Sequence, residues 1–301
     1  MLFLSKNSLF SSLILSIIVS LGWGGGSFAE ASPVTACELM ISVSPSEDVA
    51  IKELPRSIDF SLSEAQSRQY FDLAVALYQK HVDLSAVSTY LKEIDKGSIS
   101  QLSENEITQL KSIRKYSLIM RNGFFIFDAS HEVPKVFDRF VTDLGHLNDE
   151  IGLNDAKNAQ KQARDLRDDV DALRDFNLSS KFKPAKRSST TDHLNDQLEV
   201  IEKYLGKKKI KADQFHEVRK IVKELMNTYL FKTSLETDSG TLASDRKVYS
   251  FLFMLNEDMG LVHDDLIAKS HNGKIDYDDY ELSVPRRIRT EIKALLDRID
   301  S

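Results

Sequence analysis

Residues 137–151 read FDRFVTDLGHLNDEI, and residues 252–266 read LFMLNEDMGLVHDDL. In both stretches apolar residues recur at spacings of 3, 4, 3 and 4, the period of a single buried helix face. Asp143, Gly145 and Asp149 in the first stretch also recur as Asp, Gly and Asp, each 115 positions later. The sequence therefore predicts a helix with one buried stripe and the same polar pattern, present once in each half of the chain.

A second pair of segments repeats in the same way. Residues 113–124 align with residues 218–229 at a shift of 105 positions, and both carry apolar residues at i, i+3, i+7 and i+11. The two shifts differ by ten residues, which places the length difference in the loop between the paired helices. Two repeated helices predict two related helical bundles.

The beginning of the chain is typical of a secretory signal peptide. Lys6 precedes the apolar residues 9–21, and small residues before Ala29 favour cleavage there, with a second option after Ala31. Residues 1–29 are thus predicted to direct export to the periplasm or the medium. Residues 34–37 have the composition of a bacterial lipoprotein cleavage site, which leaves lipidation of Cys37 as an alternative.

Composition excludes several classes of protein and of site. Cys37 is the only cysteine, so an intrachain disulfide and a thiolate metal site are both ruled out. The net charge is −6; residues 30–178 hold 17 basic and 25 acidic residues, whereas residues 179–301 hold 22 and 21. This balance argues against nucleic-acid binding, which requires a basic surface.

The rest of the chain reads as helix almost throughout. An irregular segment is predicted for residues 30–60, a helical half for 61–178 and a second helical half for 192–301. Capping boxes are expected at Ser61 with Glu64 and at Ser103 with Glu106. The basic, Ser-rich and Pro-containing residues 179–191 are predicted to link the halves. We expect an all-α fold of two tandem related bundles with a pseudo-two-fold internal repeat.

Basic residues cluster opposite the buried stripe of the second repeated pair. At about 100° per residue, His216, Arg219 and Lys223 fall on one face of their helix. The corresponding side of the first copy carries Lys111, Arg114 and Arg121, with Leu118 in place of Lys223. These faces are either solvated surface, as on any amphipathic helix, or they turn toward each other and line an anion-binding groove.

The spacing His216-x-x-Arg219-x-x-x-Lys223 resembles the basic signature of the CHAD family (conserved histidine α-helical domains). Residues 144–149, LGHLND, resemble another motif of that family, and residues 259–264 are a more divergent copy. The resemblance implies a duplicated helical bundle associated with inorganic polyphosphate. The chain departs from the family at Lys111, where the family has histidine, at Leu118, and in being acidic and exported.

Other candidate sites are set aside. The glycines of the repeat are attributed to close helix packing. Asp149 and Asp264 are expected to cap a helix or to pair with an arginine of a neighbouring helix, and not to bind a metal. Residues 272–279 resemble half of an EF-hand loop but lack ligand positions, so an acidic turn is expected. His263-Asp264 resembles a metal pair of helical phosphohydrolases without the further ligands, and no common hydrolase or nucleotide-binding motif is present.

The sequence thus predicts an exported, non-enzymatic helical protein without a cofactor or metal. Its ligand would be polyphosphate or another polyanion, bound in a groove between the halves. The alternative is a periplasmic scaffold whose partner is another envelope protein; a further alternative is a metal-dependent hydrolase. Membrane contact is not expected unless Cys37 is lipidated. The residues assigned to the ligand are His216, Arg219, Lys223, Arg114, Arg121 and Lys111.

Overall fold

The computed structural model describes residues 49–97, 99 and 102–299. The predicted signal peptide, Cys37 and most of the predicted irregular segment lie outside the described residues. Within the described part, nine α-helices and one 3₁₀ turn are joined by loops, and strand is limited to one two-residue pair. The all-α class expected from the sequence is confirmed.

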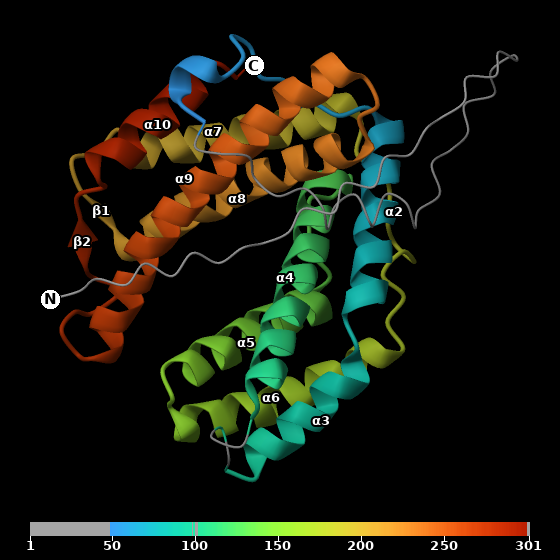
Figure 1. Cartoon of the computed structure of the whole chain (residues 1–301), viewed down its shortest axis with the longest axis vertical. Coiled ribbons are helices and arrows are strands. Elements are labelled where there is room, and N and C mark those ends of the chain that lie inside the picture. The colour runs from blue at the N-terminus through green and yellow to red at the C-terminus, as the bar shows by residue number, and fades with distance from the viewer. Residues whose placement is uncertain (1–48, 98, 100–101, 300–301) are drawn as a thin grey trace, which may run out of the picture. The chain divides into compact units, whose positions relative to one another are not determined.

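The elements follow one another along the chain as labelled in Figure 1. They are η1 (Ile51–Glu53), α2 (Glu64–His81), α3 (Leu84–Asp95), α4 (Glu104–Phe127), α5 (Lys135–Gly152), α6 (Ala156–Arg174), α7 (Arg187–Leu205), β1 (Ile210–Lys211), α8 (Ala212–Leu235), α9 (Ser239–His271), β2 (Glu281–Leu282) and α10 (Arg286–Leu296).

The helices pack as two groups in chain order. In the first group α2 packs on α4, α4 on α5, α5 on α6, and α6 on α3. In the second, α8 packs on α7 and α9, and α10 packs on α9 (Figure 1). The contact between α4 and α8 connects the groups, and their apolar side chains belong to one hydrophobic core.

The repeated apolar stripe is buried in both copies, as its period predicts. In α5 the side chains of Phe137, Phe140, Leu144 and Leu147 are fully buried, and Ile151 is 8% exposed. In α9 the stripe is buried at Leu252, Leu255, Met259 and Leu266, and only Val262 is half-buried. Because each buried aliphatic or aromatic side chain contributes about 2 kcal/mol, this stripe fixes which face of each helix points inward.

The helix ends confirm one predicted capping box and correct the other. Ser103 accepts a hydrogen bond from the backbone N–H of Glu106 at 3.3 Å, and the Glu106 carboxylate accepts the Ser103 N–H at 2.7 Å. At α2 the box is formed by Ser63 and Gln66, two residues later than expected. The Ser61 N–H instead donates to the carboxylate of Asp59, so Ser61 lies in a turn before the helix.

The segment predicted to link the halves is held against the first group. Phe182 stacks on Phe71 with ring centroids 3.6 Å apart. The backbone N–H of Ala185 donates to the carbonyl of Phe127, and that of Ala129 donates to the carbonyl of Lys183. The helix α7 already begins at Arg187, inside the predicted linker. The chain therefore passes from one group to the next through a packed segment.

Candidate functional site

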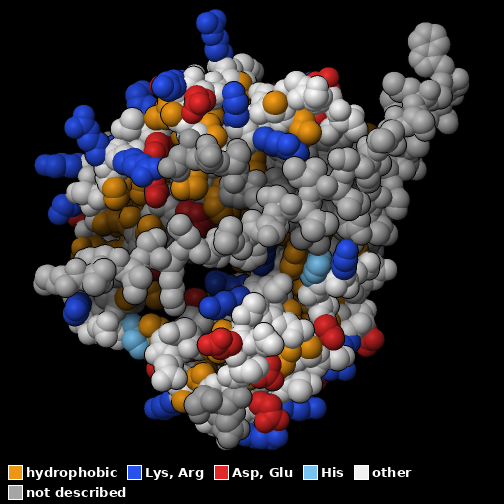
Figure 2. Space-filling model, viewed as in Figure 1, with side chains coloured by type: hydrophobic (Ala, Val, Ile, Leu, Met, Phe, Trp, Pro, Cys, Tyr) orange, Lys and Arg blue, Asp and Glu red, His pale blue; other side chains and the backbone are white. Residues whose placement is uncertain are grey.

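The site lies where the long helices α4 and α8 meet, each with its repeated partner α5 or α9 packed beside it. We call the four basic residues Arg114 and Arg121 on α4, and Arg219 and Lys223 on α8, the arginine–lysine cluster. All four side chains are half-buried. Figure 2 shows Lys and Arg side chains gathered inside a hollow in this face of the molecule.

Each repeated glycine makes room for an arginine of the cluster. A Cβ added at Gly145 would lie 3.1 Å from an Nη of Arg114, and one added at Gly260 would lie 3.0 Å from an Nη of Arg219. From the sequence, these glycines were expected to allow close packing of two helices. In both cases, however, the group nearest to an added Cβ is an arginine guanidinium. Glycine inside a helix costs about 1 kcal/mol relative to alanine, and here it lets an arginine lie flat against the neighbouring helix.

The two arginines of α4 are paired with carboxylates of α5. Arg121 Nε lies 2.7 Å from Asp138, and Arg114 lies 3.6 Å from Asp149. The pairing of Asp149 with an arginine is thereby confirmed. Both contacts stay within the first group of helices, so they orient the arginines without spanning the hollow.

Among the described residues, the two basic residues of α8 have no such partner. Neither Arg219 nor Lys223 has a carboxylate oxygen within 4.0 Å among the described residues. Burial, together with the nearby charges of Arg219 and Arg114, lowers the pKa of Lys223 to about 8. Burial also lowers the pKa of Arg219, partly opposed by Asp264 and Glu257. The hollow thus holds two partly desolvated cations that no carboxylate of the described part of the chain neutralises at close range.

Charged side chains of the first group of helices act on basic side chains of the second group. Arg114 and Arg121 of α4 both lower the pKa of Lys223 on α8, and Arg114 also acts on Arg219. The four residues of the arginine–lysine cluster are therefore brought together, although Arg114 and Lys223 are more than a hundred residues apart in the sequence. Lys111 is exposed on α4 and is not among the main charges acting on these groups.

His216 lies in the same region but contributes no charge at neutral pH. Its ring stacks on His263 of α9 with centroids 4.5 Å apart, and its Nδ1 is buried and has no hydrogen-bond partner in the described ranges. Burial, together with the neighbouring His263 and basic side chains, lowers the pKa of His216 to about 3. A neutral imidazole can hydrogen-bond to a ligand but does not attract it as a counter-charge.

Carboxylates at the edge of the hollow limit its positive charge. Asp149 and Asp264 are exposed, and burial of part of Asp149 raises its pKa against the opposing effect of Arg114. Asp264 raises the pKa of Asp149 as well, so the two acids lie near each other across α5 and α9. Any bound anion must compete with these groups for the arginines.

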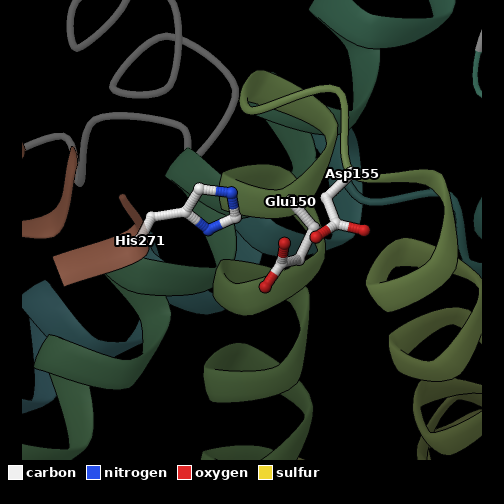
Figure 3. A group of neighbouring side chains, drawn as sticks. All are labelled: Glu150, Asp155 and His271. Atoms are coloured by element: carbon white, nitrogen blue, oxygen red, sulfur yellow. The ribbon is translucent and has the colours of Figure 1, made fainter. Parts of the chain in front are cut away.

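A separate group of side chains has the composition of a cation site. Glu150 at the end of α5, Asp155 before α6 and His271 at the end of α9 can place one ligand atom each within 4.8 Å of the others. Figure 3 shows His271 projecting from α9 toward the two carboxylates. The sequence predicted no metal site, and no short motif marks this one. The acidic turn at 272–279 contributes nothing to the group.

Comparisons with protein-family models, with curated proteins and with solved structures find no match to this chain. In the part of the chain that the structure describes, no helix has both the length and the apolar character needed to cross a membrane.

Proposed function

We propose that this protein is a non-enzymatic binding protein whose arginine–lysine cluster takes polyphosphate or a similar polyanion in the hollow between α4 and α8. The observation that carries the proposal is the burial of Arg219 and Lys223 without a nearby carboxylate among the described residues. Both are half-buried and lack a carboxylate within 4.0 Å among the described residues. A desolvated cation without a counter-ion destabilises a fold, and a bound anion removes that cost.

The arrangement suits a ligand with several charged oxygens. Arginine guanidinium groups form bidentate hydrogen bonds to phosphate, and a lysine adds a compact charge. Because Arg114 and Arg121 come from α4 and Arg219 and Lys223 from α8, one extended anion would contact both helices. Neutral His216 supplies a further hydrogen-bonding group beside Arg219, one turn of α8 away.

The resemblance of residues 216–223 to the CHAD signature supports the same ligand class. The predicted signal peptide would place this site outside the cytoplasm, in the periplasm or the medium. On α4, Leu118 stands at the position that corresponds to Lys223, and both arginines of that helix are already paired with carboxylates, so α8 would supply the stronger half of the site.

The proposal is tested by titrating the protein with polyphosphate chains and with tripolyphosphate in a calorimeter. The Arg219→Ala/Lys223→Ala variant is expected to lose binding by about two orders of magnitude, since charge-assisted hydrogen bonds contribute about 1.5–3 kcal/mol each. The matched control is Lys208→Ala/Lys209→Ala, which removes the same charge from the exposed loop before β1. Raising the salt concentration should weaken wild-type binding steeply.

Two results would overturn the proposal. One is equal weakening in the loop variant, which would show that net charge alone attracts the polymer. The other is the absence of binding in the wild-type protein, which would leave the alternative of a helical interaction protein with a solvated basic face.

A further inference from the structure

We propose that Glu150, Asp155 and His271 form a binding site for a divalent transition-metal ion, with zinc as the ion of closest fit. The site would join the turn between α5 and α6 to the end of α9, and thus the two groups of helices. It is distinct from the arginine–lysine cluster, none of whose members takes part in it.

The ligand set matches the chemistry of zinc. Two carboxylates and one imidazole are hard and intermediate donors, a combination that favours zinc and neighbouring metals over calcium or magnesium, which bind oxygen alone. In a tetrahedral zinc site, bonds of about 2.1 Å place ligand atoms about 3.4 Å apart. The three donor atoms already lie within 4.8 Å of one another, so small side-chain rotations would bring them to this spacing.

The backbone fixes the first two donors at a helix end. The N–H of Asp155 donates to the carbonyl of Glu150 at 3.0 Å, and the N–H of Asn154 donates to that of Ile151 at 3.1 Å. Asn154 has a φ of 56°, the left-handed conformation that ends a helix in a Schellman motif. This turn folds the Asp155 carboxylate back beside Glu150.

The third donor comes from a second helix end of the same kind. The N–H of Lys274 donates to the carbonyl of Lys269 at 2.9 Å, and Gly273 has a φ of 64°. His271 is the last residue of α9 and is exposed, so its ring can reorient toward the carboxylates. The negative end of the α9 dipole also favours a cation at this position.

The Glu150 carboxylate lies beside a second carboxylate, and no lysine or arginine of the described residues is among the groups that act most strongly on it. Its Oε2 is fully buried and has no hydrogen-bond partner among the described residues. The groups that act most strongly on this carboxylate are Asp155, His271, Asp149 and His146, with no lysine or arginine among them. A half-buried carboxylate beside a second carboxylate is stabilised when a cation binds between them.

The Asp155 carboxylate keeps lone pairs that could bind a metal ion. Its Oδ1 accepts the backbone N–H of Asn158 at 3.1 Å, and its Oδ2 accepts the Asn158 side-chain amide at 3.0 Å. Each oxygen keeps a second lone pair. The hydrogen bonds to Asn158 orient the carboxylate, as second-sphere groups do in protein metal sites.

The test is calorimetric titration of the untagged full-length chain with zinc at neutral pH, followed by the variants Glu150→Gln and His271→Gln. Each variant is expected to weaken zinc binding about tenfold or more, because each removes a direct ligand. Circular dichroism checks that the variants remain folded. The control is His146→Gln, since His146 is the other exposed histidine and lies one turn from Glu150 on α5.

The stoichiometry and the response of the three variants distinguish a zinc site from its absence. One zinc ion per chain, lost in Glu150→Gln and His271→Gln but retained in His146→Gln, supports the site. No saturable binding in the wild type, or an equal loss in His146→Gln, overturns it. Because these variants leave the arginine–lysine cluster intact, polyphosphate binding measured on the same samples reports on the other proposal separately.

Discussion

The substitution Lys223→Met is expected to stabilise the free protein while weakening its binding of polyphosphate. Lys223 lies half-buried beside Arg219 and Arg114, and its pKa falls from 10.5 to about 8, chiefly through burial. At about 1.4 kcal/mol per pKa unit, this fall corresponds to about 3 kcal/mol of destabilisation by the buried charge. Solvent still reaches the side chain, so about 2 kcal/mol is the expected gain for methionine, which keeps the apolar stem without the charge.

The stability difference between Lys223→Met and the wild type should also depend on pH, which tests the prediction independently. A lysine whose folded-state pKa is depressed destabilises the fold fully below that pKa of about 8, and ceases to do so above its unfolded value of 10.5. The advantage of Lys223→Met over the wild type should therefore be largest at neutral pH. It should shrink as the pH rises through the window between those two values.

The assay is urea unfolding followed by circular dichroism at neutral pH and again near pH 10, without added anion. Lys220→Met is the matched control, because Lys220 is exposed on the same helix and lies 3.8 Å from Glu217. Its unfolding free energy should change by less than about 0.5 kcal/mol. A Lys223→Met variant that is no more stable than the wild type at neutral pH would refute the reasoning about a desolvated, unneutralised cation.

The same variant separates stability from binding. Tripolyphosphate should raise the melting temperature of the wild-type protein, because a ligand that binds only the folded state stabilises it. The rise should be much smaller in Lys223→Met. An undiminished rise would show that Lys223 is not part of the anion site, even if its burial is costly.

Two further substitutions test the geometry around the cluster. Gly260→Ala would place a Cβ 3.0 Å from an Nη of Arg219 and displace the guanidinium, so polyphosphate affinity should fall severalfold in calorimetry. The control is Gly152→Ala, whose added Cβ would have no described atom within 4 Å; it should leave affinity unchanged and add up to about 1 kcal/mol of helix stability. His216→Gln should flatten the acid side of the stability profile, since a histidine whose pKa falls from 6.5 to about 3 on folding contributes stability above its unfolded value that is lost as pH falls through this window. Identical acid unfolding of variant and wild type in a pH titration would contradict the burial of His216.

Helix positions and inward faces were largely predictable from the sequence. The stripe beginning at Phe137 and its counterpart beginning at Leu252 have a helical period, and burying them is the dominant favourable term in folding. Capping was less predictable, because Ser61 and Ser63 both precede suitable partners. Only the hydrogen bonds decide which serine begins α2.

The candidate site was predictable in part. The basic residues of α4 and α8 were placed on faces opposite the core by helical geometry, but their exposure was left open between solvent and a groove. The roles of Gly145 and Gly260 were missed. The recurrence of both the arginine and the glycine in each copy was a usable signal, although nothing in the spacing says that one lies against the other.

Local sequence determined which residues become helix and which side of each helix is apolar, because both depend on neighbours within a few positions. Tertiary structure alone decided that Arg114 and Lys223 share a hollow and that half-buried His216 stacks on His263. It also decided that donor atoms of Glu150 and His271 lie within 4.8 Å of each other. These pairs are distant along the chain, so their proximity follows from how the helices pack. The burial and the charge environment of a residue at such a contact cannot be read from the residues next to it in the sequence.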